Sequence, residues 1–191
     1  MFKRTVSIAF HFVLILGTAV TVYFIFMAEE SLLLLGGNGY HDSIAPMQIL
    51  MPTVLLIGLS NITGMQILTP CGEENKVLVS IVGGAVLDFV LNLLLIPNYG
   101  ASGAAFATLL AELLVLIVQC YYLRQLLRDI VKYIPFWKYV VSVGAGIILM
   151  LGVKYGIEIP SVFAQSTTLG AFFELAVTAV AFFGGEGIAL I

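Results

Sequence analysis

Long apolar runs alternate along the chain with short polar stretches, and this pattern predicts the secondary structure. Six apolar segments are separated in this way, each close to the about 20 residues that a helix needs to cross a bilayer. They lie at residues 6–27, 43–69, 77–96, 101–123, 139–156 and 168–190. A membrane β-barrel would show alternating segments of about 10 residues, so we predict an all-α, polytopic bundle of six transmembrane helices in a single domain.

The composition of the chain supports a lipid environment. Of its 191 residues, 61% are hydrophobic and only 10% are charged, and the mean hydropathy is +1.11. Soluble proteins are about half apolar and a quarter charged, and a water-soluble fold of this size cannot bury so much apolar surface. The first apolar segment is longer than the core of a signal peptide and lacks a clear cleavage site, so we predict a retained helix.

The distribution of charge predicts the orientation. Lys and Arg concentrate on the cytoplasmic side of membrane proteins. With the N-terminus inside and six helices threaded, only Lys154 falls outside, and seven basic residues fall inside: Lys3, Arg4, Lys76, Arg124, Arg128, Lys132 and Lys138. We therefore expect an inner-membrane protein with both ends of the chain in the cytoplasm. No basic patch with interleaved aromatic residues is present, so nucleic acid is not an expected partner.

Three connections carry further predictions. The Pro97-Asn98-Tyr99-Gly100 sequence predicts a tight turn that makes segments 77–96 and 101–123 antiparallel neighbours. Residues 124–138 are basic and amphipathic, which is typical of a helix in the cytoplasmic interface, although an ordinary solvated connector is the alternative. Pro52 lies inside an apolar segment and predicts a kink, either a hinge or a passive bend.

Polar residues inside the predicted membrane segments are the candidate site. Asp88 and Glu112 lie near the middle of neighbouring segments, at depths that differ by about one helical turn. A carboxylate at the bilayer centre costs about 2.5–3.5 kcal/mol on insertion scales, so both groups should face protein or water. With Asn92, they are candidates for lining a water-filled substrate or ion cavity. The alternative is a purely structural contact, such as a hydrogen bond from a Ser or Thr to Asp88.

The sequence contains no catalytic or metal-binding motif. HExxH, P-loop, GxSxG and clustered His/Cys patterns do not occur. Cys71 and Cys120 form neither a CxxC pair nor a disulfide framework, and both fall on the predicted cytoplasmic side, where thiols stay reduced. We therefore expect no enzymatic activity, no cofactor and no bound metal, with coupling to H⁺ or Na⁺ left open.

Three stretches together resemble one transporter family. They are LGGNGYHDSIAPMQILMP before and within the second segment, ILTPCGEENK after it, and NLLLIPNYGASGAAFATLLAE across the predicted turn. These stretches resemble the carboxy-terminal part of the polysaccharide-biosynthesis flippases, which are related to the multidrug and toxin extrusion transporters. The most specific stretch is residues 92–108. The resemblance extends over residues 3–128, and the last two segments match only by pattern.

The resemblance implies alternating-access transport of lipid-linked oligosaccharide from the cytoplasmic to the periplasmic leaflet, as in O-antigen or capsule export. The family has two six-helix bundles, often with two further helices, whereas this chain has six segments that match the last part. We therefore expect a fragment of a longer transporter, or a partner for a missing amino-terminal half or a second copy. The alternatives are a cation-coupled multidrug antiporter and a truncated, inactive membrane fragment.

Overall fold

The computed structural model of the protein describes residues 2–131 and, beyond them, only the short stretches 141, 143–148, 151–152, 177–180 and 182. Every element in the part of the chain that the structure describes is helical, which confirms the all-α prediction there. In chain order the elements are α1 (Phe2–Phe26), α2 (Ala28–Gly36), η1 (Gly37–Ser43), α3 (Ile44–Leu50), α4 (Pro52–Asn61), η2 (Ile62–Leu68), α5 (Glu74–Tyr122) and α6 (Arg124–Val131). The predicted helices at 139–156 and 168–190 lie largely outside the described residues.

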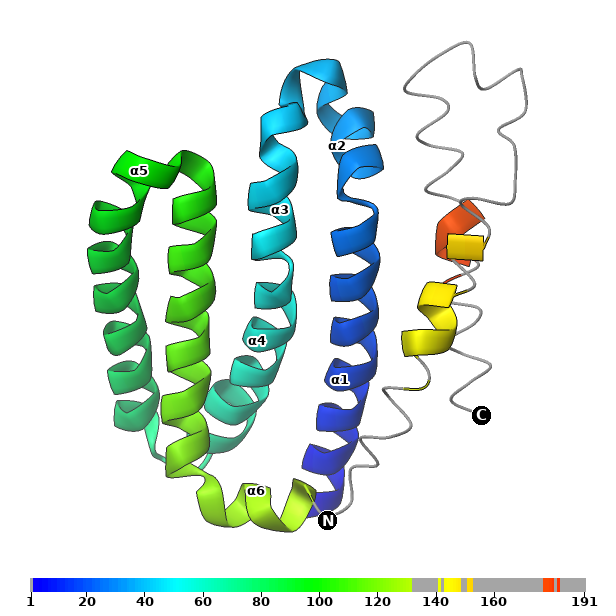
Figure 1. Ribbon diagram of the computed structural model, residues 1–191. Coiled ribbons are helices and arrows are strands. Elements are labelled where there is room, and N and C mark those ends of the chain that lie inside the picture. Colours follow the sequence, from blue (N-terminus) through cyan, green and yellow to red (C-terminus); the bar gives the residue numbers. More distant parts are fainter. Residues whose placement is uncertain are drawn as a thin grey trace. The chain divides into compact units, whose positions relative to one another are not determined.

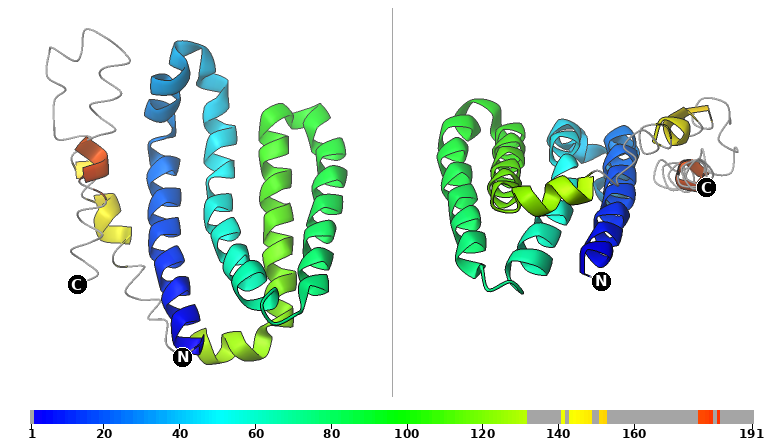
Figure 2. Two further views of the ribbon diagram at one scale, coloured as in Figure 1. Left: turned by 180° about the vertical axis from the view of Figure 1, so that it is seen from behind. Right: turned by 90° about the horizontal axis from the view of Figure 1, so that it is seen from below.

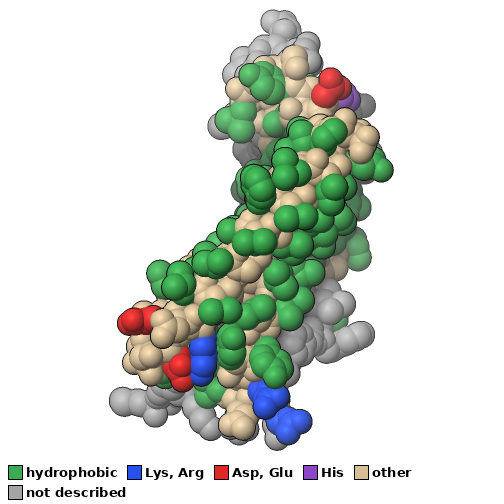
Figure 3. Space-filling view, turned by 90° about the vertical axis from the view of Figure 1, so that its left-hand side faces the viewer, with side chains coloured by type: hydrophobic (Ala, Val, Ile, Leu, Met, Phe, Trp, Pro, Cys, Tyr) green, Lys and Arg blue, Asp and Glu red, His purple; other side chains and the backbone are tan. Residues whose placement is uncertain are grey.

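Three helices of the described chain are long and apolar enough to cross a membrane. They span Thr5–Phe26, Gly39–Leu68 and Glu74–Tyr122. Large apolar side chains are exposed along the third, including Phe89 at 66% and Leu93 at 62%. Figure 3 shows this apolar surface over α5, with the described Lys and Arg side chains gathered near one end. Such a continuous apolar surface suits lipid and not water, because soluble proteins rarely expose apolar patches of this size.

The chain forms two compact units. One comprises residues 1–18 and 49–134, and the other comprises residues 19–48 and 135–191. Helices α1 and α3 each contribute to both units. In the first unit, the beginning of α1 packs closely against α4, because a Cβ added at Gly58 would lie 2.8 Å from a methyl carbon of Val13.

Helix α5 is a hairpin of two antiparallel arms, which confirms the predicted turn (Figures 1 and 2). The backbone reverses at Gly100, whose φ of 54° and ψ of −131° are non-helical. We call residues 74–99 the first arm and residues 101–122 the second arm. The arms approach closely because small residues face each other: a Cβ at Gly84 would lie 2.4 Å from a Val115 methyl carbon and 3.3 Å from the Ala111 carbonyl oxygen.

The second predicted segment contains two irregularities. The helix is interrupted between α3 and α4 at Met51, and Pro52 occupies the start of α4, where its missing N–H is tolerated. Met51 nevertheless keeps helical φ and ψ angles, so the predicted kink at Pro52, as a hinge or a passive bend, stays a prediction. The second irregularity was not predicted: η2 is a π-helix, in which the Thr69 N–H donates to the Gly64 carbonyl five residues earlier at 2.9 Å.

The second unit contains the acidic connection between the first two predicted segments. It is helical, because α2 and η1 fill it, and Glu29 and Glu30 lie in the first turn of α2. Carboxylates are favourable there because the N-terminus of a helix carries partial positive charge. The buried core of this unit includes Tyr23, Met27 and Phe182.

Candidate functional site

A cavity of about 400 Å³ lies in the first unit, between the α4–η2 segment and the two arms of α5. Its polar lining residues come from all three of these elements and lie among apolar ones. The polar lining residues are Ser60, Asn61, Asp88, Thr108, Glu112 and Gln119. The cavity is therefore a largely apolar space that contains six polar side chains, within helices whose outer surfaces are apolar.

The two predicted carboxylates meet at this cavity from opposite arms. Asp88 comes from the first arm and Glu112 from the second, and both are half-buried. The two groups interact electrostatically. The Thr108 hydroxyl donates to Asp88 Oδ1 at 3.3 Å, which is the interhelical contact that the structural alternative expected. The two carboxylates line the same cavity because the turn at Gly100 brings residues of similar depth on the two arms side by side.

Asn92 is the predicted site residue that does not line this cavity. It lies one turn beyond Asp88 on the first arm, and its Oδ1 is buried without a hydrogen-bond partner among the described residues. Asn92 is therefore not brought to this cavity with Asp88 and Glu112, and its role in lining a substrate or ion cavity stays a prediction. The physical reason that it does not line this cavity is the helical repeat: residues four apart are rotated by about 40° relative to each other, so a four-residue stripe drifts around the helix.

A buried polar network adjoins the cavity at Gln119. The Thr63 hydroxyl of η2 donates to Gln119 Oε1 at 2.5 Å, and Gln119 Nε2 donates to the Ser80 hydroxyl at 3.0 Å. All three side chains are almost completely buried. The network joins η2 to both arms of α5. Gly64 lies against it, since a Cβ there would be 3.0 Å from Gln119 Nε2.

The polar contribution of the α4–η2 segment was missed from the sequence. Ser60, Asn61 and Thr63 lie close together there, without the four-residue spacing that marked the arms as polar-faced. A cluster of polar residues in an otherwise apolar segment was the available signal. Pro52, the predicted hinge, is not among the residues that line the cavity.

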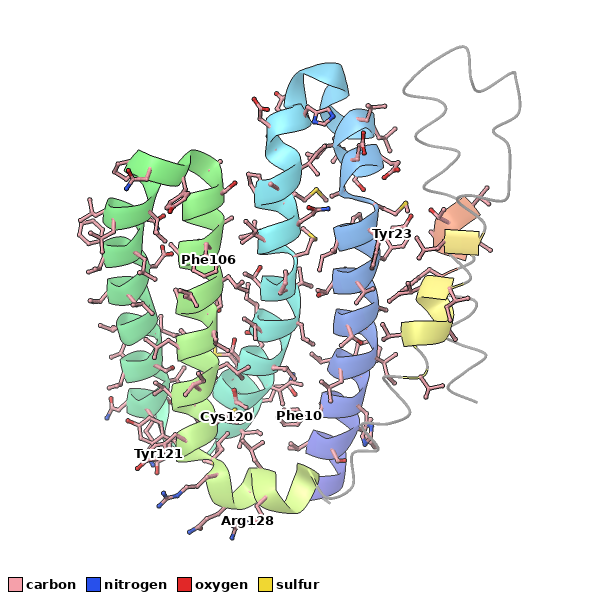
Figure 4. All side chains as sticks on the ribbon, in the orientation of Figure 1. Phe10, Tyr23, Phe106, Cys120, Tyr121 and Arg128 are labelled. Atoms are coloured by element: carbon pink, nitrogen blue, oxygen red, sulfur yellow. The ribbon has the colours of Figure 1, made fainter. Side chains whose placement is uncertain are left out.

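A second cavity of about 330 Å³ lies near the turn of the hairpin. It is lined by Ile49, Leu95, Tyr99, Ser102, Gly103 and Phe106. Phe106 projects from the second arm in Figure 4. Among its described lining residues, only Tyr99 and Ser102 have polar side chains, and none carries a charge, so this space is less polar than the cavity at Asp88 and Glu112.

The cavity at Asp88 and Glu112 has the chemistry of a hydrogen-bond acceptor site. Ionised carboxylates accept hydrogen bonds, and the Asn61 amide and the Ser60 hydroxyl can both donate and accept. None of the described lining residues is basic. Among the described residues, no cluster of three or more His, Cys, Asp and Glu side chains is arranged to hold a metal ion. Such a site suits hydroxyl-rich or cationic ligands.

Comparisons of the chain with protein-family models, with curated proteins and with solved structures found no match.

Proposed function

We propose that the chain is a membrane transporter, or part of one, that moves lipid-linked oligosaccharide from the cytoplasmic to the external leaflet by alternating access. The observation that carries the proposal is the cavity at Asp88 and Glu112. Carboxylates inside membrane helices are rare, and they are typical of substrate or ion pathways. Sugar hydroxyls are donors that carboxylate and amide oxygens accept.

The sequence resemblance supports the same substrate class. Its most specific stretch, residues 92–108, contains the turn of the hairpin and the beginning of the second arm. We infer that the two arms cross the bilayer separately, so that residues 2–131 supply four crossings. The segments at 139–156 and 168–190 would supply two more, in the bacterial inner membrane with both ends in the cytoplasm. Basic residues that would hold a lipid pyrophosphate would then come from a second copy or another chain segment.

A cell-based measurement tests this proposal. Cells in which the gene is deleted should accumulate lipid-linked oligosaccharide on the cytoplasmic leaflet, measured by leaflet-resolved labelling. Chromosomal Asp88→Asn and Glu112→Gln variants should accumulate it as well, because each removes an acceptor charge from the cavity. Glu74→Gln is the matched control, since Glu74 is exposed at the start of α5. Normal leaflet distribution in the deletion strain would contradict the proposal.

A cation-coupled multidrug antiporter is the second candidate. The observation that favours it is the charge of the cavity, because two carboxylates and no basic residue line its described part. Such a site attracts organic cations. Increased drug susceptibility of the deletion strain, with an unchanged distribution of lipid-linked oligosaccharide, would identify this activity in place of the flippase.

A further inference from the structure

A cluster of basic and aromatic side chains lies at the end of the α5 hairpin remote from Gly100. Lys76 Nζ lies 5.5 Å from the centroid of the Tyr122 ring, and the Arg124 guanidinium carbon lies 5.2 Å from that of Tyr121. The two tyrosine rings are 6.0 Å apart. The first arm supplies Lys76, the second arm supplies both tyrosines, and α6 begins at Arg124.

The position of this cluster along the span places it at headgroup depth. The apolar span of α5 ends at Tyr122, and Tyr is enriched where membrane helices meet the headgroup layer. Helix α6 then runs crosswise to the arms (Figure 1), so its residues stay near this depth. The cluster and α6 therefore lie where lipid phosphates are expected.

Helix α6 is amphipathic. Leu126 and Leu127 are half-buried, whereas Arg124, Gln125 and Arg128 are exposed. Arg128 projects away from the helices in Figure 4. An exposed basic face beside a partly buried apolar face is typical of helices that lie in the membrane interface. In the sequence, Lys132 continues the four-residue spacing of the two arginines.

The two arginines have charge available for a ligand. Neither Arg124 nor Arg128 forms an ion pair within the part of the chain that the structure describes, whereas Lys76 pairs with Glu73 at 2.7 Å. The basic side chains of this surface without an ion pair among the described residues are therefore the two arginines of α6. Guanidinium groups bind phosphate through two parallel hydrogen bonds, and stacking on Tyr121 holds one of them in place.

We propose that Arg124 and Arg128, flanked by Tyr121, form a binding site for the phosphate of an anionic phospholipid. The lipid belongs to the leaflet at the α6 end of the hairpin, which is cytoplasmic in the predicted orientation. A lipid fits better than free phosphate, because the arginines follow the end of the apolar span of α5 and Leu127 lies next to Arg124 around the helix, as an apolar contact for the lipid glycerol and acyl chains. This site is independent of the proposed transport activity, since it lies outside the cavity.

Lipid binding to the full-length chain tests the proposal directly. The purified protein is mixed with equal amounts of phosphatidylglycerol and phosphatidylcholine with identical acyl chains, and the lipids it retains are counted by native mass spectrometry. We expect preferential retention of phosphatidylglycerol. The Arg124→Gln and Arg128→Gln variants should each lower this preference about fivefold, which corresponds to about 1 kcal/mol per basic residue near an anionic surface.

Two control variants distinguish binding at the two arginines from a general effect of substitutions in α6. Gln125→Asn changes an exposed, uncharged neighbour on α6 and should leave the preference unchanged. Arg124→Lys keeps the charge but not the two-bond geometry, and should keep most of the preference. Equal retention of the two lipids by the unmodified protein, or an unchanged preference in the Arg124→Gln/Arg128→Gln double variant, would overturn the proposal. Displacement of phosphatidylglycerol by inorganic phosphate at matched ionic strength would overturn the lipid assignment in favour of a small-anion site.

Discussion

Gln119 lines the cavity and links η2 to the first arm of α5. It accepts a hydrogen bond from Thr63 and donates one to Ser80, and it is only 2% exposed. Both hydroxyls have backbone alternatives: Thr63 lies 3.2 Å from the Leu59 carbonyl oxygen, and Ser80 donates to the Val77 carbonyl at 2.7 Å. Removing the amide therefore leaves neither hydroxyl without an acceptor.

We predict that the volume of Gln119 stabilises the unit more than its hydrogen bonds do. Hydrogen bonds between membrane helices contribute about 0.6 kcal/mol on average, whereas a buried cavity from truncation to Ala costs about 2 kcal/mol or more. Gln119→Leu should thus lower the free energy of unfolding by about 1 kcal/mol, and Gln119→Ala by at least twice as much. Reversible unfolding in mixed detergent micelles measures both. Equal losses would show that the polar network dominates.

The positions of single residues could be predicted from the sequence where those residues lie in a regular helix. Asp88 and Glu112 could be assigned to one depth because each lies a similar number of residues from the same turn, and the structure brings them to one cavity. Thr63 was marked only by the nearby polar residues and could not be assigned to a helix face, because the π-helix η2 begins beside it at Ile62. A π turn accommodates an extra residue and rotates the next part of the helix by about 100°, so a 3.6-residue pattern loses phase there.

At the scale of elements, the α5 hairpin depends on the backbone of Gly100. Its φ of 54° and ψ of −131° lie in a region that L-residues avoid, and a Cβ there would meet no atom within 4 Å. Gly100→Ala therefore introduces backbone strain without a steric clash. We predict a loss of about 1–3 kcal/mol in the free energy of unfolding, measured in the same micelle assay.

Gly83 provides a matched control for this prediction. It lies in the helical first arm with a negative φ, and a Cβ at this position also meets nothing within 4 Å. Gly83→Ala should be neutral or stabilising by up to about 1 kcal/mol, because Ala is the better helix former. A similar loss in both variants would contradict the claim that the turn conformation is what requires glycine at residue 100.

The elements differ in how far the sequence determines them. The hairpin turn was predictable because Pro and Gly have fixed backbone preferences that act locally. The helices α2 and η1 in the acidic connection were not predicted, because a short polar stretch between apolar runs has no periodicity that distinguishes a helix from a loop.

At the scale of the whole molecule, the apolar composition determines the environment and the basic residues determine the expected orientation. Apolar side chains exposed along α5 agree with a lipid environment. The expected orientation can be tested by finding the side of the membrane at which each end of the hairpin lies. Cys71 is exposed in the turn before α5, and Tyr99 is 67% exposed beside Gly100, so one residue near each end of the hairpin is open to a chemical probe.

These two residues test orientation and crossing together. A Cys120→Ala variant keeps Cys71 as the sole thiol, and adding Cys71→Ser and Tyr99→Cys moves that thiol to the opposite end of the hairpin. Because basic residues favour the cytoplasm, a membrane-impermeant maleimide should label Cys71 only in inverted vesicles and the Tyr99→Cys variant only in intact cells. The reverse result would invert the orientation. Labelling of both from one side would mean that the hairpin does not cross, since arms long enough to span the bilayer place the two ends of a crossing hairpin on opposite faces.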